Sequence, residues 1–198
     1  DKPELYKGYY VAILDSDEIN AFATSGGHIL ITRGLLECTA SEDALAAVIA
    51  HEVAHIQLQH NIKAIKSSRA TNAILATASG AIKISGKEDL IALTDAFGES
   101  VNEVVNSLVN SGYSQEQEFQ ADKTALMLMA NAGYYPSAMT DMLHLLKTRL
   151  GSSNTGFGKT HPSPEARLLK VTIELKGISA TDSSASRLQR FNSNMKQL

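Results

Sequence analysis

The residues with the clearest chemical potential are His51, Glu52 and His55, which form the pattern H-E-x-x-H inside the apolar run 48–56. On a helix, His51 and His55 lie on one face about one turn apart and can direct two imidazole nitrogens at one metal ion. Glu52 lies beside them, where its carboxylate can take a proton from a metal-activated water. This combination is typical of zinc hydrolases. The alternative, a surface helix with two histidines and a Glu, does not fit the apolar residues around them.

A catalytic zinc ion needs a third protein ligand, and a helix predicted to begin at Ser114 offers Glu116 and Glu118. These two residues lie on roughly opposite sides of a helix, so only one of them can face the metal. Glu118 shares its side with residues that indicate a buried face, namely Ala121, Asp122, Ala125 and Met129. We therefore predict Glu118 as the third ligand. The alternative is a surface Glu that interacts with the helix dipole.

Asp122 follows Glu118 by one helical turn, so its carboxylate is expected near the metal ligands. A carboxylate in this place can accept the second ring N–H of a ligating histidine, which fixes the tautomer and makes the ring more basic. We predict this role for Asp122. The alternative is a buried Asp that binds a backbone N–H.

Three motifs occur in a set order: H-E-V-A-H at 51–55, E-F-Q-A-D at 118–122, and T-H-P at 160–162 followed by Arg167. Together they resemble the M48 zinc metallopeptidases, a family with Ste24-like and HtpX-like members and with soluble or lipid-anchored bacterial envelope members. The resemblance extends from about residue 10 to about residue 175. H-E-x-x-H alone would not distinguish this family from other metallopeptidases, whereas the three motifs in this order do.

The resemblance implies a zincin-like (gluzincin) α+β fold, mostly helical, with a small sheet next to the H-E-x-x-H helix. It implies one Zn²⁺ per chain and a metalloendopeptidase acting on peptides or on unfolded and misassembled proteins, with Glu52 as general base. It also places His161 at the cleft, where it either donates to the developing oxyanion or coordinates zinc in a closed, resting state. Arg167 would lie near it and contact the substrate.

One position departs from the family's pattern. The family often has Arg after the Tyr-Ser pair at 113–114, where this chain has Gln115. The chain begins at Asp1, without a Met and close to the first predicted strand, which indicates a processed or trimmed form and leaves room for a lipid anchor upstream. The resemblance implies a location in the bacterial periplasm or cell envelope.

Three short strands are predicted before the metal helix, over 9–14, 20–23 and 28–32. A turn at 25–27 makes the second and third strands an antiparallel hairpin. The second strand contains Asn20, Ala21 and Phe22, is short, and is expected at the sheet edge. The resemblance implies that this segment binds substrate backbone above the metal. The alternative is an ordinary core strand.

The helix that carries H-E-x-x-H is predicted from about residue 41 to residue 60, with Thr39 or Ser41 as its N-cap. His60 lies five residues beyond His55 and therefore off the metal face of a continuous helix. We predict a partly exposed surface histidine at this position, and no metal ligand.

The remaining chain is predicted to be helical around a loop at 151–160. Residues 61–111 form a helical insertion, which either belongs to the core or covers the cleft as a lid. Further helices are expected over 114–131, 136–150 and 163–176, with a short last one from residue 186. The length of 198 residues favours a single catalytic domain over 1–198.

Composition excludes several other functions. The formal net charge is −3 without a long run of Lys or Arg, which argues against nucleic acid as a partner. There is no run of about 18 consecutive apolar residues, so we expect a soluble chain without a membrane span. The single cysteine excludes an internal disulfide and a cysteine-rich zinc site. The sequence does not define an oligomeric state.

A second hypothesis is a zinc-holding scaffold that binds partner proteins and cleaves little. Glu52 favours an enzyme, because a structural zinc site needs no general base and usually closes its fourth position with a protein ligand. A permanent fourth ligand at His161 would favour the scaffold.

Overall fold

The computed structural model describes residues 5, 8–64, 112–150, 157–161, 164–178 and 185–196. These residues are mostly helical with one small sheet, which confirms the predicted α+β class. The predicted insertion lies outside the described residues from residue 65 onward. Among the described helices, none combines the length and apolar character that a bilayer crossing requires.

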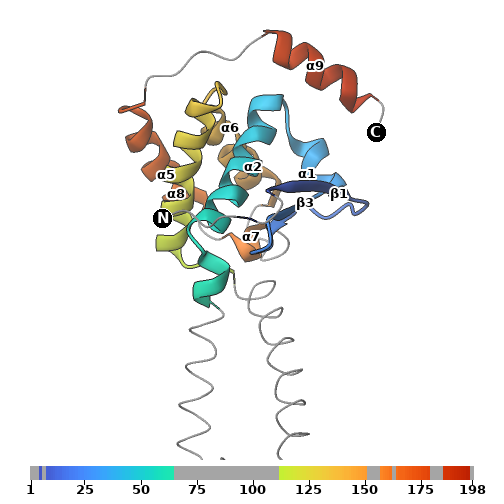
Figure 1. Ribbon diagram of the computed structural model, residues 1–198. Helices are drawn as coiled ribbons and strands as arrows, with labels where there is room; N and C mark the ends of the chain where they lie inside the picture. Colours follow the sequence, from blue (N-terminus) through green and yellow to red (C-terminus); the bar gives the residue numbers. More distant parts are fainter. Residues whose placement is uncertain are drawn as a thin grey trace, which may run out of the picture.

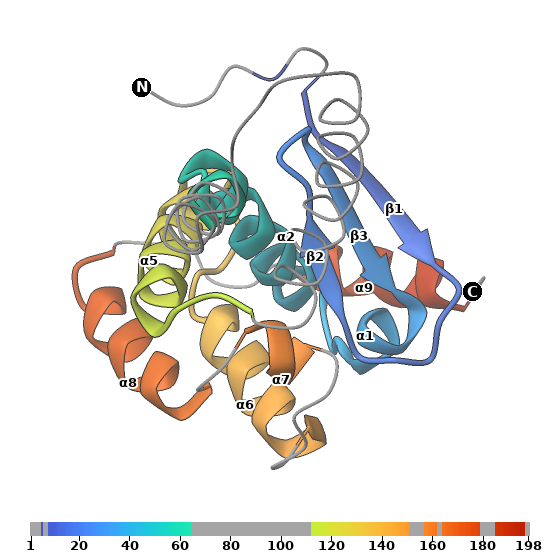
Figure 2. The ribbon, with the colours of Figure 1, turned by 90° about the horizontal axis from the view of Figure 1, so that it is seen from below.

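The sheet has the strand order β1–β3–β2, with β1 at Tyr10–Leu14, β2 at Ala21–Ala23 and β3 at His28–Thr32. β2 and β3 form the predicted antiparallel hairpin, whereas β1 runs parallel to β3. β2 is therefore an edge strand, and it packs against α2 (Figure 2). The predicted edge position of the second strand is confirmed.

The metal helix, α2 (Glu42–Gln57), begins after a short helix that the sequence prediction lacks, α1 (Arg33–Cys38). Thr39 closes α1, where its backbone N–H donates to the last carbonyls, so it is not the N-cap of α2. Ser41 takes that role, and its Oγ accepts from Ala44 N at 3.1 Å. Of the two predicted caps, Thr39 is wrong and Ser41 is confirmed.

Among the described residues, α2 lies at the centre, between the sheet and α5 (Gln115–Asn131), as Figure 1 shows. α6 (Ala138–Leu150) packs on α2, and α8 (Pro164–Leu175) packs on both α5 and α6. α9 (Ala185–Met195) lies near the start of α2. Because α2 is covered on several sides, its polar residues are buried and must find partners inside the protein.

α2 ends earlier than predicted, at Gln57, and a turn at 58–59 separates it from a second helical segment at 60–64. Within the turn, Gln59 has a φ of 56°, in the left-handed region, which costs a residue other than glycine roughly 1 kcal/mol or more. The break means that His60 does not continue around the helix, and this changes its environment.

α5 begins with the predicted capping box. Ser114 Oγ accepts from Gln117 N at 3.3 Å, and the Gln117 side chain accepts from Ser114 N at 2.9 Å. The box fixes the first turn of α5, which also carries Glu118. The predicted start of this helix is therefore confirmed.

The predicted loop at 151–160 contains a short helix, α7 (Phe157–Thr160). Phe157 N donates to Ile19 O at 2.9 Å, and Thr160 O accepts from Tyr113 N at 3.0 Å. The Phe157 side chain is buried, which provides the apolar anchor for this turn. α7 is thus held between the approach to β2 and the start of α5, and this fixes the histidine that follows it.

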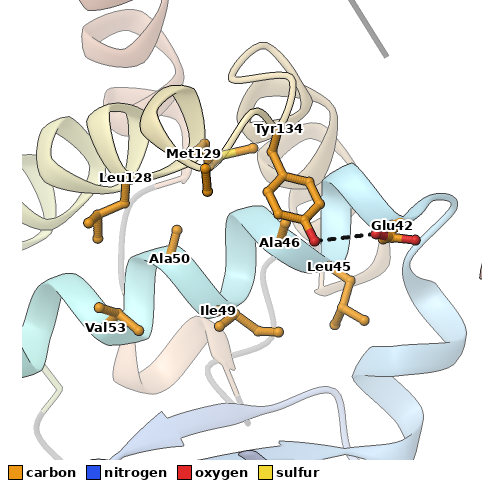
Figure 3. A pocket seen from close by; sticks show the side chains of 10 residues that line it. Glu42, Leu45, Ala46, Ile49, Ala50, Val53, Leu128, Met129 and Tyr134 are labelled. Atoms are coloured by element: carbon orange, nitrogen blue, oxygen red, sulfur yellow. Dashed lines mark hydrogen bonds between the residues drawn. The ribbon is translucent and has the colours of Figure 1, made fainter. Parts of the chain in front are cut away.

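An apolar groove of about 340 Å³ lies between α2 and α5 (Figure 3). Leu45, Ile49 and Val53 line it from α2, about half a turn around the helix from the two histidines of H-E-x-x-H. Its main polar feature is Tyr134, whose hydroxyl donates to Glu42 at 3.3 Å. The described lining of the groove includes one carboxylate, Glu42, and no histidine, so it lacks a set of metal ligands.

Candidate metal centre

Four potential metal ligands meet on the inner side of α2: His51, His55, Glu118 and His161. Their donor atoms all lie within 4.8 Å of one another, and each residue is at most 1% exposed. His51 Nε2 is 3.0 Å from His55 Nε2 and 3.1 Å from His161 Nδ1. Two donors bound to one tetrahedral zinc ion at about 2.0–2.1 Å lie roughly 3.3 Å apart, so these separations suit a single ion.

Two helices position the three predicted ligands: α2 carries both histidines, and α5 carries the glutamate. His51 and His55 share one face of α2 because they are four residues apart. Glu118 is fully buried in α5, and its Oε1 is 3.3 Å from His55 Nε2. Glu116 is exposed, and its carboxylate accepts from the Gln120 side chain instead. The structure therefore brings Glu118, and not Glu116, to the two histidines, as predicted.

Glu52 is fully buried beside this cluster. Its Oε1 is 3.3 Å from His161 Nε2, but neither of its carboxylate oxygens accepts a hydrogen bond from the part of the chain that the structure describes. A buried carboxylate without donors is costly, so the position indicates a polar or charged species that the described residues do not supply.

Asp122 and Arg167 form a buried ion pair behind the ligands. Arg167 donates from Nε and Nη2 to the two Asp122 oxygens at 2.8 and 2.7 Å, and its Nη1 is 2.8 Å from Glu118 Oε2. Asp122 Oδ1 is also 2.9 Å from His51 Nδ1, which is the contact predicted from the sequence.

The substrate contact predicted for Arg167 stays a prediction. Its side chain is only 1% exposed, and its guanidinium faces Asp122 and Glu118 on the inner side of the site. These two buried carboxylates hold the guanidinium on the inner side of the site.

The protonation states of most of these groups suit metal binding. The exception is His51: burial and Arg167 lower its pKa, but Glu118 and Asp122 raise it to about 9, so this ring loses a proton when a metal ion binds. Burial would raise the pKa of Asp122, but Arg167 lowers it to about 2, so the carboxylate is ionised. Burial also opposes ionisation of Glu118, yet His161 and Arg167 bring its pKa well below the ordinary value. Burial lowers the pKa of His55 well below its ordinary value, so its Nε2 offers a lone pair.

The balance of charge also fits a divalent cation. Glu52, Glu118 and Asp122 contribute three buried carboxyl groups, and Arg167 contributes one guanidinium. When these four groups are ionised and the histidines are neutral, three negative charges and one positive charge leave two negative charges among the described residues, which one Zn²⁺ would balance. Imidazole and carboxylate donors in a four-membered set are ligands that zinc prefers. The residues present therefore fit the predicted zinc ion.

The predicted surface position of His60 is wrong. The side chain is fully buried rather than partly exposed, and its Nδ1 is 2.9 Å from His55 Nδ1. The prediction assumed a continuous helix, whereas the left-handed Gln59 breaks it and brings His60 back towards the metal face. The sequence around the break contains no Gly or Pro that would have signalled it.

Two aromatic rings stack on histidines of the site, and the sequence did not predict a role for either ring. Tyr113 stacks on His55 with ring centroids 3.8 Å apart, and Phe157 stacks on His161 at 4.2 Å. The hydroxyl of Tyr113 donates to the Asn61 side chain. Phe157 is the one aromatic residue in the Gly- and Ser-rich stretch 151–160, which is the signal that could have marked it as an anchor.

The predicted substrate strand lies close to the site but is covered in this structure. Asn20 N and O both bind β3 through Thr32, at 3.0 Å each. Ala21 is fully buried, and Phe22 is partly buried. Ala23 O accepts from the Asn61 side chain at 2.8 Å. Substrate binding by Asn20, Ala21 and Phe22 stays a prediction, and it requires the outer edge of β2 to be uncovered.

The fold and the site together define a zincin-like metal centre on a central helix. In a comparison with known families, the model described as "Peptidase family M48" matches residues 3–174. The chain therefore belongs to peptidase family M48, as the order of its motifs indicated.

Individual relatives carry protease names. The chain is 30% identical over 158 residues to "Mitochondrial metalloendopeptidase OMA1" of Schizosaccharomyces pombe, 28% over 166 residues to "Beta-barrel assembly-enhancing protease" of Escherichia coli, and 31% over 167 residues to "Metalloprotease LoiP" of Escherichia coli. These alignments cover 77%, 81% and 84% of the chain, but only 42%, 33% and 60% of the respective relatives. The chain thus spans less than two thirds of each relative.

Replacing Asp122 tests its contact with His51. We predict that Asp122→Ala lowers zinc affinity about 10–100-fold, because the ring of His51 loses the acceptor that orients it. Competition with a coloured chelator measures the affinity, and Asp141→Ala, at an exposed position of α6, is the matched control. An affinity equal to that of the wild type would limit Asp122 to a structural role.

Proposed function

We propose that the chain is the catalytic domain of a zinc-dependent endopeptidase. The observation that carries the proposal is the buried carboxylate of Glu52, which lacks hydrogen-bond donors among the described residues and lies beside three ligands of the zincin type. Membership of family M48 and the protease names of the relatives support it. His51, His55 and Glu118 would hold the metal.

The bound zinc ion would polarise the scissile carbonyl and acidify a water molecule. Glu52 takes the proton of that water and passes it to the leaving amine, which needs a carboxylate that is ionised and not engaged by other donors. Asp122 holds His51 in the tautomer that presents Nε2 to the site, and Arg167 keeps both Asp122 and Glu118 in place.

His161 closes the site in the described conformation. Its Nδ1 lies 3.1 Å from both Glu118 Oε1 and His51 Nε2, within the set of metal donors, and its Nε2 faces Glu52. Ala21, on the predicted substrate strand, is covered at the same time. Of the two roles considered for His161, this geometry supports the fourth ligand of a resting state. Donation to an oxyanion would require His161 to leave this position.

A zinc-holding scaffold would also use His161 as a fourth ligand, but it does not explain the buried carboxylate of Glu52. A permanently closed structural zinc site would have no reason to bury a further carboxylate without donors, because that carboxylate weakens the fold. The enzyme explains both features when His161 is displaced on substrate binding. We therefore favour the endopeptidase over a partner-binding scaffold.

For the whole protein we propose peptides and unfolded or misassembled proteins as substrates, and the bacterial cell envelope as the location. Two of the relatives described above are bacterial, and one is named for enhancing β-barrel assembly. A lipid anchor upstream would be compatible with this location.

Glu52→Gln separates metal binding from catalysis. We predict that the variant keeps one zinc per chain but cleaves unfolded casein about 10²–10⁴-fold more slowly, because the amide cannot take the water proton. Glu165→Gln, at an exposed position of α8, is the control and should cleave like the wild type. A Glu52→Gln protein with wild-type turnover would remove Glu52 from the mechanism and with it the proposed reaction.

His161→Ala tests the closed state. If His161 competes with substrate for the fourth position, its removal should raise casein turnover and leave zinc content unchanged, since three ligands remain. Turnover and zinc content are measured on the same preparation. A lower turnover would instead support the oxyanion role, and an unchanged turnover would place His161 outside the reaction.

A further inference from the structure

His60 lies outside the set of metal donors, yet like the ligands it is closed off from solvent. Its ring is 0% exposed, with Nδ1 2.9 Å from His55 Nδ1. On the opposite side of the ring, His60 Nε2 is 3.4 Å from Gln120 Oε1. Gln120 in turn donates to Glu116 at 3.0 Å, at the exposed start of α5. The ring therefore bridges the ligand His55 and the surface of α5.

The hydrogen bond between the two rings fixes both tautomers. His55 Nε2 faces Glu118 and His51, so it must be unprotonated to bind a metal, and the ring proton is then on Nδ1. That proton is donated to His60 Nδ1, which must be a bare acceptor. The proton of His60 consequently lies on Nε2, directed at the Gln120 carbonyl oxygen.

We propose that His60 is a positioning residue for the metal ligand His55, in the way that Asp122 serves His51. The inference rests on the metal site of the proposed function. The two ligand histidines thus have unlike supports: His51 donates to an ionised carboxylate, and His55 donates to a neutral imidazole. A neutral acceptor adds no negative charge to a site that already contains three carboxyl groups and one guanidinium.

The break in the metal helix allows His60 to reach His55. A continuous helix would turn His60 away from His55, and the left-handed Gln59 prevents this at a conformational cost. Strain of this kind persists where the surrounding structure gains from it. Here the gain is an acceptor for the second ligand histidine.

Two substitutions of His60 distinguish positioning from packing. His60→Asn places an amide oxygen close to where Nδ1 lies, so it should accept from His55 and keep most of the zinc affinity. His60→Leu fills a similar volume without an acceptor, and we expect it to lower zinc affinity about 10–100-fold. His144→Leu, at an exposed position of α6, is the control. Affinity is measured by chelator competition, and thermal unfolding of the metal-free proteins measures packing.

The outcomes are distinct. A lower zinc affinity in His60→Leu, largely restored in His60→Asn, supports the positioning role. Equal affinities in both variants and the wild type, or equal losses that follow the stability of the metal-free proteins, would overturn it. A wild-type protein that binds no zinc would instead refute the metal site of the proposed function.

Nitrogen NMR of the histidine rings provides a second, independent measurement on the zinc-loaded wild type. We expect the ring proton of His55 on Nδ1 and that of His60 on Nε2. A proton on His60 Nδ1 would contradict the inference, because that nitrogen could not accept from His55.

Discussion

The structure depends on burying three carboxyl groups around a single guanidinium. Glu52, Glu118 and Asp122 all lie in the contact between α2, α5 and α8, and Arg167 is the cation that faces them there. Isolated buried carboxylates are unfavourable by several kcal/mol each, so the interior formed by the described residues favours further positive charge. A divalent metal ion at the His51–His55–Glu118 cluster meets that requirement. Metal binding and the packing of the central helices are therefore linked, because the ion that balances the buried carboxylates would also supply the chemistry.

The elements around α2 serve to deliver these side chains at fixed orientations. The capping box at Ser114 fixes the turn of α5 that carries Glu118, and α7 holds the segment that ends in His161. The turn at 58–59 returns His60 to the site. Each ligand histidine then has a hydrogen-bond partner on its second nitrogen, Asp122 in one case and His60 in the other. Ligands held in this way lose little freedom when the metal binds.

Much of this could be predicted from the sequence because the signals are local and periodic. The spacing of His51 and His55, the burial pattern that selects Glu118, and the Ser114 capping box each follow from helix geometry. Local pattern does not show the features that depend on tertiary contacts. No sequence rule marks a left-handed Gln59, so the sequence predicts a surface position for His60, and the structure buries it. The inward direction of Arg167 depends on two carboxylates from another helix, and the turn at α7 depends on burial of Phe157.

The most direct test of the metal centre is the zinc content of the folded protein, measured by mass spectrometry for the wild type, Glu118→Gln and Glu116→Gln. Both substitutions change one carboxylate in the first turn of α5, but only Glu118 is buried against the histidines. We expect about one zinc per chain in the wild type and in Glu116→Gln, and its loss from a folded Glu118→Gln protein. Full zinc retention in Glu118→Gln, or loss from Glu116→Gln, would contradict the three-ligand site on which the proposed endopeptidase rests.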